Sequence, residues 1–212
     1  GRNVMNKKKP ILYTLIAEGF TEYKFISIYL LRLAESMGLR VKRSSVDLLK
    51  SQPSKSRVLT GVYRFGITAL QEDNHDLFLV GVDLDQPDHT PEQTHHAAQL
   101  DELSAALKTL RKAYSDRIVL YVPVQAIESW LAYQAYKING SACPPAYSME
   151  SKKQDDLKAM LYGSKDAKIL KMETVAGAIA RNADFDELAR QSKSFKHFHD
   201  QVISFLKTAA NP

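Results

Sequence analysis

The sequence predicts an α/β protein in which a parallel sheet of about four strands is flanked by helices and followed by a C-terminal helical extension. Two observations lead to this prediction. Short apolar runs alternate with longer segments of helical periodicity up to about residue 125, which is typical of βαβ units. Beyond that point only helical patterns follow, so the sheet is expected to be complete before the last third of the chain.

The four expected strands are recognised by their apolar content. Three of them are almost continuously apolar, as parallel strands buried on both faces are, and the second alternates only loosely. Their expected ranges are 11–17, 40–49, 77–83 and 118–123.

The expected helices have apolar positions three and four residues apart. Pro91 is well placed as the first residue of one of them. They span about 21–37, 57–70, 91–114, 126–136, 152–162, 167–180 and 195–207. The proline-containing stretch at 140–145 is the expected boundary region. We therefore divide the chain into a basic tail (1–10), an α/β domain (11–137) and a helical extension packed on it (138–212).

Composition limits the class of protein. Cys143 is the only cysteine, so an internal disulfide and a cysteine-rich zinc site are excluded. No apolar stretch approaches the 18 or so residues of a membrane-spanning helix, and the N-terminal residues lack the apolar segment of a signal peptide. We expect a cytoplasmic protein without membrane contact.

The net charge of +5 is distributed unevenly. Residues 71–107 contain nine Asp and Glu and not one Lys or Arg, whereas the rest of the chain carries 29 basic residues against 15 acidic ones. An acidic centre within a basic surround would suit an enzyme that holds a metal ion and acts on a polyanion. Uneven charge is also common in ordinary soluble proteins.

Acidic residues follow three of the predicted strands. Glu18 and Glu22 come after the first, Asp83 and Asp85 after the third, and Glu128 after the fourth. Parallel sheets bind ligands at the carboxyl ends of their strands, so we expect these carboxylates to converge there. Grouped carboxylates repel one another unless a cation lies between them, and oxygen ligands suit Mg²⁺ or Mn²⁺.

Each acid also has a structural interpretation. Glu22 and Glu128 lie in the first turn of predicted helices, where the helix dipole stabilises negative charge. Glu18 could be a solvated loop residue. The two aspartates are harder to explain structurally, because strand alternation would direct both side chains to one side of the sheet.

The order of these motifs resembles the Toprim domain found in primases, type II topoisomerases and overcoming-lysogenization-defect (OLD) nucleases. The motifs are Glu-Gly-Phe-Thr-Glu at 18–22, Asp-Leu-Asp at 83–85 and Ile-Glu-Ser-Trp-Leu at 127–131. Within that superfamily the chain is most similar to small stand-alone Toprim proteins related to RloB, which are often encoded beside an ABC-type ATPase in phage-defence loci. The resemblance covers about residues 11–133, with a weaker match at 193–196.

The resemblance implies a two-metal site of Mg²⁺ or Mn²⁺ and a nuclease acting on DNA or RNA. Carried over to this chain, the metal ligands would be Glu18, Glu22, Asp83, Asp85 and Glu128; Glu18, Asp83, Asp85 and Lys196 would act in catalysis. The chain departs from the nuclease pattern at Val124, where a serine is usual, so one metal would be held less completely.

The function expected from this resemblance is that of a metal-dependent phosphodiester hydrolase, the effector of a bacterial anti-phage defence system. The alternative is a non-catalytic Toprim module that binds nucleic acid or docks on an ABC-type ATPase partner. Nucleotidyl transfer is disfavoured because no separate glycine-rich phosphate loop is visible. The adjacent His95 and His96 are expected to be solvated, and His197 and His199 are expected at the surface.

Overall fold

A computed structural model of the chain describes residues 9–44, 54–88 and 94–211. Its centre is a parallel sheet of β1 (Ile11–Ile16), β2 (Val41–Arg43), β3 (Leu77–Gly81) and β4 (Ile118–Tyr121). The strands lie in the order β2-β1-β3-β4, with Thr14 opposite Phe78 in one pair and Val80 opposite Leu120 in the next. The predicted four-stranded α/β architecture is confirmed.

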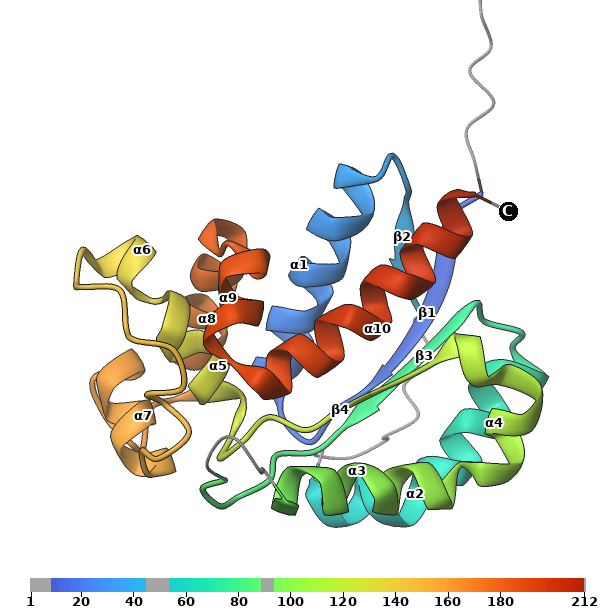
Figure 1. The fold of residues 1–212 in the computed structure, drawn as a ribbon, viewed down its shortest axis with the longest axis horizontal. Coiled ribbons are helices and arrows are strands. Elements are labelled where there is room, and N and C mark those ends of the chain that lie inside the picture. The colour runs from blue at the N-terminus through green and yellow to red at the C-terminus, as the bar shows by residue number, and fades with distance from the viewer. Residues whose placement is uncertain (1–8, 45–53, 89–93, 212) are drawn as a thin grey trace, which may run out of the picture.

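Helices cover both faces of this sheet (Figure 1). One face carries α1 (Phe20–Ser36) and α10 (Lys193–Ala210), and the other carries α2 (Lys55–Ile67), α3 (Thr94–Ala106) and α4 (Lys108–Tyr114). The remaining helices gather beyond the carboxyl end of the strands. They are α5 (Ile127–Gln134), α6 (Tyr136–Asn139), α7 (Gln154–Tyr162), α8 (Ile169–Asn182) and α9 (Phe185–Gln191).

Strand alternation separates the core into two layers. Leu77 and Leu79 of β3 join the layer beneath α1 and α10, whereas Phe78 and Val80 join the layer beneath α2, α3 and α4. Each apolar side chain removed from water contributes roughly 1.5–3 kcal/mol. The double burial of β3 explains its uninterrupted apolar sequence, and it places the carboxyl end of the strand at the centre of the sheet edge.

The C-terminal helices belong to the same core as the sheet. Phe195 and Phe198 of α10 pack against Trp130 of α5, which is fully buried, and against Tyr29 of α1. The Trp130 indole donates a hydrogen bond of 2.9 Å to Ser194 Oγ, so the buried polar group is satisfied. Residues 138–212 therefore support the position of α5 and, with it, the acid in its first turn.

Several elements differ from their predicted extent. The helix expected up to residue 114 breaks at Leu107 into α3 and α4, and the helix expected up to residue 70 ends as a π-helix at Thr68–Glu72. A 3₁₀ turn at Ser115–Arg117 and the whole of α9 were not predicted. Strand β2 is only three residues long; the expected residues 45–49 and 91–93 lie outside the described part of the chain.

No helix among the described residues is both long and apolar enough to cross a membrane.

Candidate metal centre

The structure brings together three of the predicted acidic residues at the carboxyl edge of the sheet. Glu18 follows β1, while Asp83 and Asp85 follow β3. One carboxylate oxygen from each lies within 4.8 Å of the others. Because β1 and β3 are adjacent parallel strands, their carboxyl ends meet at one edge, as the sequence predicted.

Backbone hydrogen bonds fix the position of Asp83. Its amide donates to Glu18 Oε2 at 3.1 Å, and its own Oδ1 accepts from the amide of Ile127 at 2.9 Å. The Asp83 carboxylate thus links the segment after β3 to the start of α5, and only 8% of the residue is exposed. Burial and bonding of this kind restrict the carboxylate to one orientation.

Asp85 reaches the site by a backbone turn and not by the strand alternation that the sequence predicted. Strand β3 ends at Gly81, and Asp85 has a left-handed backbone with φ of 63°. Its amide donates to Gln125 O at 2.9 Å, which ties this turn to the segment after β4. The side chain is held by Lys55 Nζ at 2.8 Å and Gln154 Nε2 at 2.7 Å. Asp85 is therefore the exposed, cation-paired member of the group.

Glu22 and Glu128 line the same cleft but have hydrogen-bond partners of their own. Glu22 Oε2 accepts from the Gly19 amide at 2.5 Å, which makes Glu22 part of the N-terminal cap of α1. Glu128 Oε1 accepts from the Tyr162 hydroxyl at 3.1 Å. Both acids are buried. Both acids therefore have a structural role. They also lie close to the other three acids, so they could contact a cation bound there.

The electrostatics of the site favour protonation or cation binding. Burial is the main cause that raises the pKa of Glu18 to about 7, and the charge of Asp85 adds to it. Burial also raises the pKa of Glu22 and Asp83 well above the usual values, reinforced by the other acids of the site. Lys55 opposes the shift at Glu18. Five acids in one place are therefore costly without a counter-ion.

Four of the five acids, Glu18, Glu22, Asp83 and Glu128, line a cleft of about 220 Å³, and Asp85 is not part of its described lining. The first residues of three helices lie on its wall: Phe20 of α1, Ile127 of α5 and Ile169 of α8. Helix N-termini carry partial positive charge, which partly offsets the acidic cluster and favours an anionic ligand. Lys158 of α7 and Met172 of α8 complete that side of the wall.

Lys196 is placed differently from the other predicted site residues. It is an exposed residue of α10 whose ammonium group pairs with Asp200 at 2.5 Å, and it is not among the described residues that line the cleft. Lys55 and Lys158 are the lysines at the acidic group. In the sequence, Lys55 belongs to one of several basic groups that are candidate phosphate contacts, and nothing singles it out from the others. No local pattern shows that the first residue of α2 reaches the segment after β3.

Two of the expected surface histidines are buried. His199 contacts the Tyr29 hydroxyl at 2.8 Å and packs on Phe195, so it is part of the aromatic core. His96 lies beside His197, and burial is the main cause that lowers its pKa to about 4. The expectation of a solvated or surface position was wrong for these two residues, because His199 faces Tyr29 and Phe195 in the core and His96 lies against His197 of α10.

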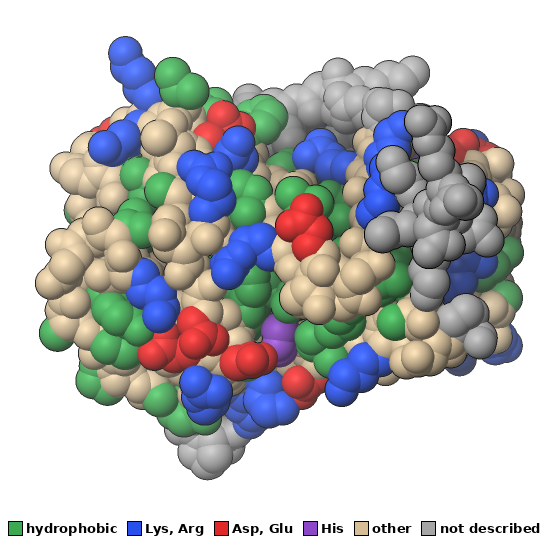
Figure 2. Space-filling view, turned by 90° about the horizontal axis from the view of Figure 1, so that it is seen from above, with side chains coloured by type: hydrophobic (Ala, Val, Ile, Leu, Met, Phe, Trp, Pro, Cys, Tyr) green, Lys and Arg blue, Asp and Glu red, His purple; other side chains and the backbone are tan. Residues whose placement is uncertain are grey.

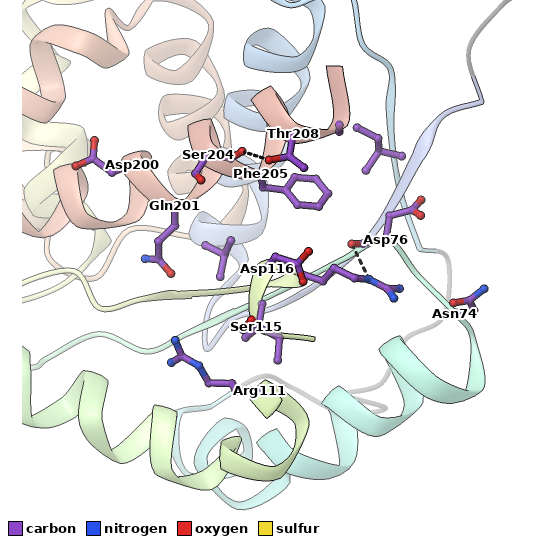
Figure 3. Close-up of a pocket in the computed structure, with 15 residues that line it drawn as sticks. Asn74, Asp76, Arg111, Ser115, Asp116, Asp200, Gln201, Ser204, Phe205 and Thr208 are labelled. Atoms are coloured by element: carbon purple, nitrogen blue, oxygen red, sulfur yellow. Dashed lines mark hydrogen bonds between the residues drawn. The ribbon is translucent and has the colours of Figure 1, made fainter. Parts of the chain in front are cut away.

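A larger cavity, of about 740 Å³, lies at the opposite edge of the sheet (Figure 3). It includes Ile11 and Ile118, the first residues of β1 and β4, and Phe205 of α10. Its charged groups serve the fold: the Asp76 carboxylate accepts from the Leu12 amide at 2.8 Å, and Arg117 donates to the carbonyl groups of His75 and Asp76. The acidic cleft is therefore the stronger functional candidate.

Comparison with known protein families, with curated proteins and with solved structures finds no match to this chain.

Proposed function

We propose that the protein is a divalent-metal-dependent phosphodiester hydrolase that cleaves DNA or RNA. The observation that carries the proposal is the group formed by Glu18, Asp83 and Asp85, whose oxygens lie within 4.8 Å of one another at the carboxyl edge of a parallel sheet. Loops at this edge are where α/β proteins place reactive groups.

The donor set fits Mg²⁺ or Mn²⁺. Glu18, Asp83 and Asp85 offer only hard oxygen ligands, and the pKa of the first two is raised first by burial and then by the neighbouring acids, so a bound cation would stabilise their charged forms. Glu22 and Glu128 would bind a second ion or would add ligands to the first. Such an ion, when bound, supplies Lewis-acid polarisation of a phosphoryl oxygen and activation of water.

The protein's own groups would position the substrate. Lys158 lines the cleft, and Lys55 pairs with Asp85 of the acidic group. Both lysines can therefore attract a phosphate group. The three helix N-termini at the cleft add backbone donors that favour an anion. Glu18 lies between the backbone of Asp83 and the cleft, where its carboxylate can accept a proton from a reacting group.

The described Lys and Arg side chains do not form one large basic patch on the face that carries α1 and α10. In the space-filling view, the described Lys and Arg side chains are spread over that face, with Asp and Glu side chains between them (Figure 2). Recognition of phosphate would depend on the lysines near the cleft more than on the net charge of +5. The excess of basic residues in the sequence therefore supports attraction of a polyanion, but it does not show where on the surface the polyanion binds.

The resemblance to RloB-related and OLD-type Toprim proteins supports a biological setting for this activity. We propose that the protein is the effector of an anti-phage defence system and acts with an ABC-type ATPase in the cytoplasm. The resemblance also carries the expectation of catalytic assistance from Lys196, although that residue pairs with Asp200 on α10. This setting rests on the motifs at 18–22, 83–85 and 127–131 alone.

The alternative is a non-catalytic module that binds nucleic acid or docks on an ATPase, and one observation favours it. Each acid of the site has a protein partner: Lys55 pairs with Asp85, Gly19 donates to Glu22, and Tyr162 donates to Glu128. Acids retained for the fold would show this pattern. Tight binding of Mn²⁺ without turnover of any nucleic acid would support this alternative.

The experiment is a cleavage screen with purified protein on plasmid, single-stranded DNA and RNA, with Mg²⁺, Mn²⁺ or chelator, alone and with the neighbouring ATPase. Asp83→Asn and Asp85→Asn keep size and most hydrogen bonding but remove the charge that holds a cation. Loss of the bound metal removes several kcal/mol of transition-state stabilisation, and each 1.4 kcal/mol or so corresponds to a tenfold change in rate. We therefore expect each substitution to lower cleavage at least a hundredfold. The double variant should be little worse than either single one, because the two residues act together.

Asp101→Asn is the matched control. Asp101 is an exposed aspartate of α3 that is not among the described residues lining the acidic cleft, so its loss should leave cleavage unchanged. Cleavage that survives both Asp83→Asn and Asp85→Asn at low Mg²⁺ would reject the metal assignment. A collapse of the melting temperature in the apo variants would instead assign the acids to the fold.

A further inference from the structure

One wall of the acidic cleft is apolar and exposed to solvent. Phe20, which begins α1 two residues after Glu18, is 38% exposed, and Ile169 at the start of α8 is 45% exposed. Both line the cleft together with Met172. Exposure of one apolar side chain is common, but apolar side chains that line the same cleft as polar groups form the mixed lining of a ligand site.

The wall is rigidly supported although its surface is open. Directly after Phe20 the chain enters α1 through the cap formed by Gly19 and Glu22, with the 2.5 Å hydrogen bond between them. Helix α8 lies close against α1, since a Cβ atom at Gly177 would come within 3.0 Å of Lys24 Cε. The two helices hold Phe20 and Ile169 at one opening without burying either of them.

The size of the cleft indicates which part of a ligand it takes. At about 220 Å³ it is smaller than the pockets of about 300–1,000 Å³ that enclose whole small molecules. It would therefore admit one portion of a larger ligand. The residues that line it are of two chemical kinds: carboxylates with Lys158, and an aromatic ring with aliphatic side chains.

We propose that Phe20 is a stacking platform for an unpaired nucleobase, so that the substrate is a single-stranded or locally unpaired nucleic acid. This inference rests on the proposed phosphodiesterase function. A phosphate that contacts Lys158 and a cation held by the acids would place the neighbouring base at the apolar wall, and stacking on an aromatic ring is how proteins hold unpaired bases without sequence preference. Bases inside a duplex are already stacked and cannot offer a face to Phe20.

The test compares Phe20→Ala, Phe20→Tyr and a control, Tyr63→Ala, for binding and cleavage of an oligothymidylate and of a duplex of the same length. Tyr63 is an aromatic residue of α2 with a similar exposure of 43%, and it is not among the described residues lining the cleft. Binding is measured by fluorescence anisotropy with Ca²⁺ in place of Mg²⁺, and cleavage with Mg²⁺.

We expect the wild-type protein to prefer the single strand and Phe20→Ala to weaken single-strand binding by about 5- to 150-fold, the range for loss of one stacked base. Phe20→Tyr and Tyr63→Ala should bind like the wild type. If the wild type cleaves but Phe20→Ala binds and cleaves both substrates normally, the stacking role is overturned while the hydrolase function stands. If the wild type neither binds nor cleaves any nucleic acid, the proposed function fails and this inference with it.

Discussion

Replacing Glu18 by Gln tests whether the acids of the cleft are held together against their mutual repulsion. Gln keeps an oxygen that can accept from the Asp83 amide, which lies 3.1 Å from Glu18 Oε2, and it removes one negative charge. We expect the variant without metal to be more stable than the wild type at pH 8, and the difference to be much smaller at pH 5.

The sign follows from proton linkage. The pKa of Glu18 is raised from 4.5 to about 7, first by burial and then by the charge of Asp85. Between these values the folded state binds more protons than the unfolded chain, so the stability contributed by this group is present below pH 4.5 and is lost as the pH rises through 7. Glu22 and Asp83, whose pKa values are raised in the same direction, add to that loss.

The magnitude follows from the size of the shift. One pKa unit corresponds to about 1.36 kcal/mol, so the shift at Glu18 corresponds to at most about 3.4 kcal/mol. Solvent screening of this partly exposed carboxylate reduces the figure, and we expect roughly 1–2 kcal/mol. In a chain of 212 residues each kcal/mol shifts the melting temperature by about 2–4 °C.

The assay is urea unfolding of the wild type and of Glu18→Gln at several pH values from 5 to 8, with chelator and then with saturating Mg²⁺ or Mn²⁺. Glu35→Gln, an exposed position near the other end of α1, is the control and should behave like the wild type. Added metal should remove most of the decline with pH in the wild type. A wild type whose stability without metal does not fall from pH 5 to 8, or a Glu18→Gln variant less stable at pH 8, would refute the reasoning.

Three further outcomes test other parts of the structure. Lys196→Ala should change the free energy of unfolding by less than about 0.5 kcal/mol, because the pair of Lys196 with Asp200 is exposed. The variant should also leave cleavage intact. A large loss of cleavage in a stable variant would instead support the catalytic role that the resemblance implies. Tyr162→Phe should lower the unfolding free energy by about 1–2 kcal/mol in urea, because the buried Glu128 loses its 3.1 Å donor; an unchanged value would mean that this bond contributes little. Affinity for an oligonucleotide, followed by anisotropy, should fall steeply with added salt as counter-ions are released; a flat salt dependence would exclude phosphate contacts as the main source of affinity.

Periodicity and residue type were sufficient to predict the parallel sheet and the meeting of the acids. Leu77–Gly81 is apolar at every position because it is buried on both faces, and this property is local to the strand. The carboxyl ends of adjacent parallel strands share one edge, so acids that follow β1 and β3 are brought to the same edge, and the backbone turn at Asp85 adds the third carboxylate. Glu18, Asp83 and Asp85 could therefore be named from the sequence.

Some local features escaped the prediction although the sequence contains a signal for one of them. Helix α9 begins at a capping residue, Asp184, whose side chain accepts from the amide of Glu187, and an acid three residues after such a cap is a known start signal. The break at Leu107 has no such signal. Leu103, Leu107 and Leu110 are all buried in the layer beneath α2, α3 and α4, and the helix contains neither Gly nor Pro at the break.

The partners of the acids were decided by tertiary structure alone. Lys55 lies 30 residues from Asp85 and Tyr162 lies 34 residues from Glu128, and these contacts arise only because α2 and α7 pack at the end of the sheet. The same packing leaves Lys196 on α10, away from the described lining of the cleft, and sets Ile169 of α8 on the cleft wall with Phe20. Sequence patterns describe what each segment buries, whereas the identity of its neighbour depends on how separate segments pack, and no local pattern contains that information.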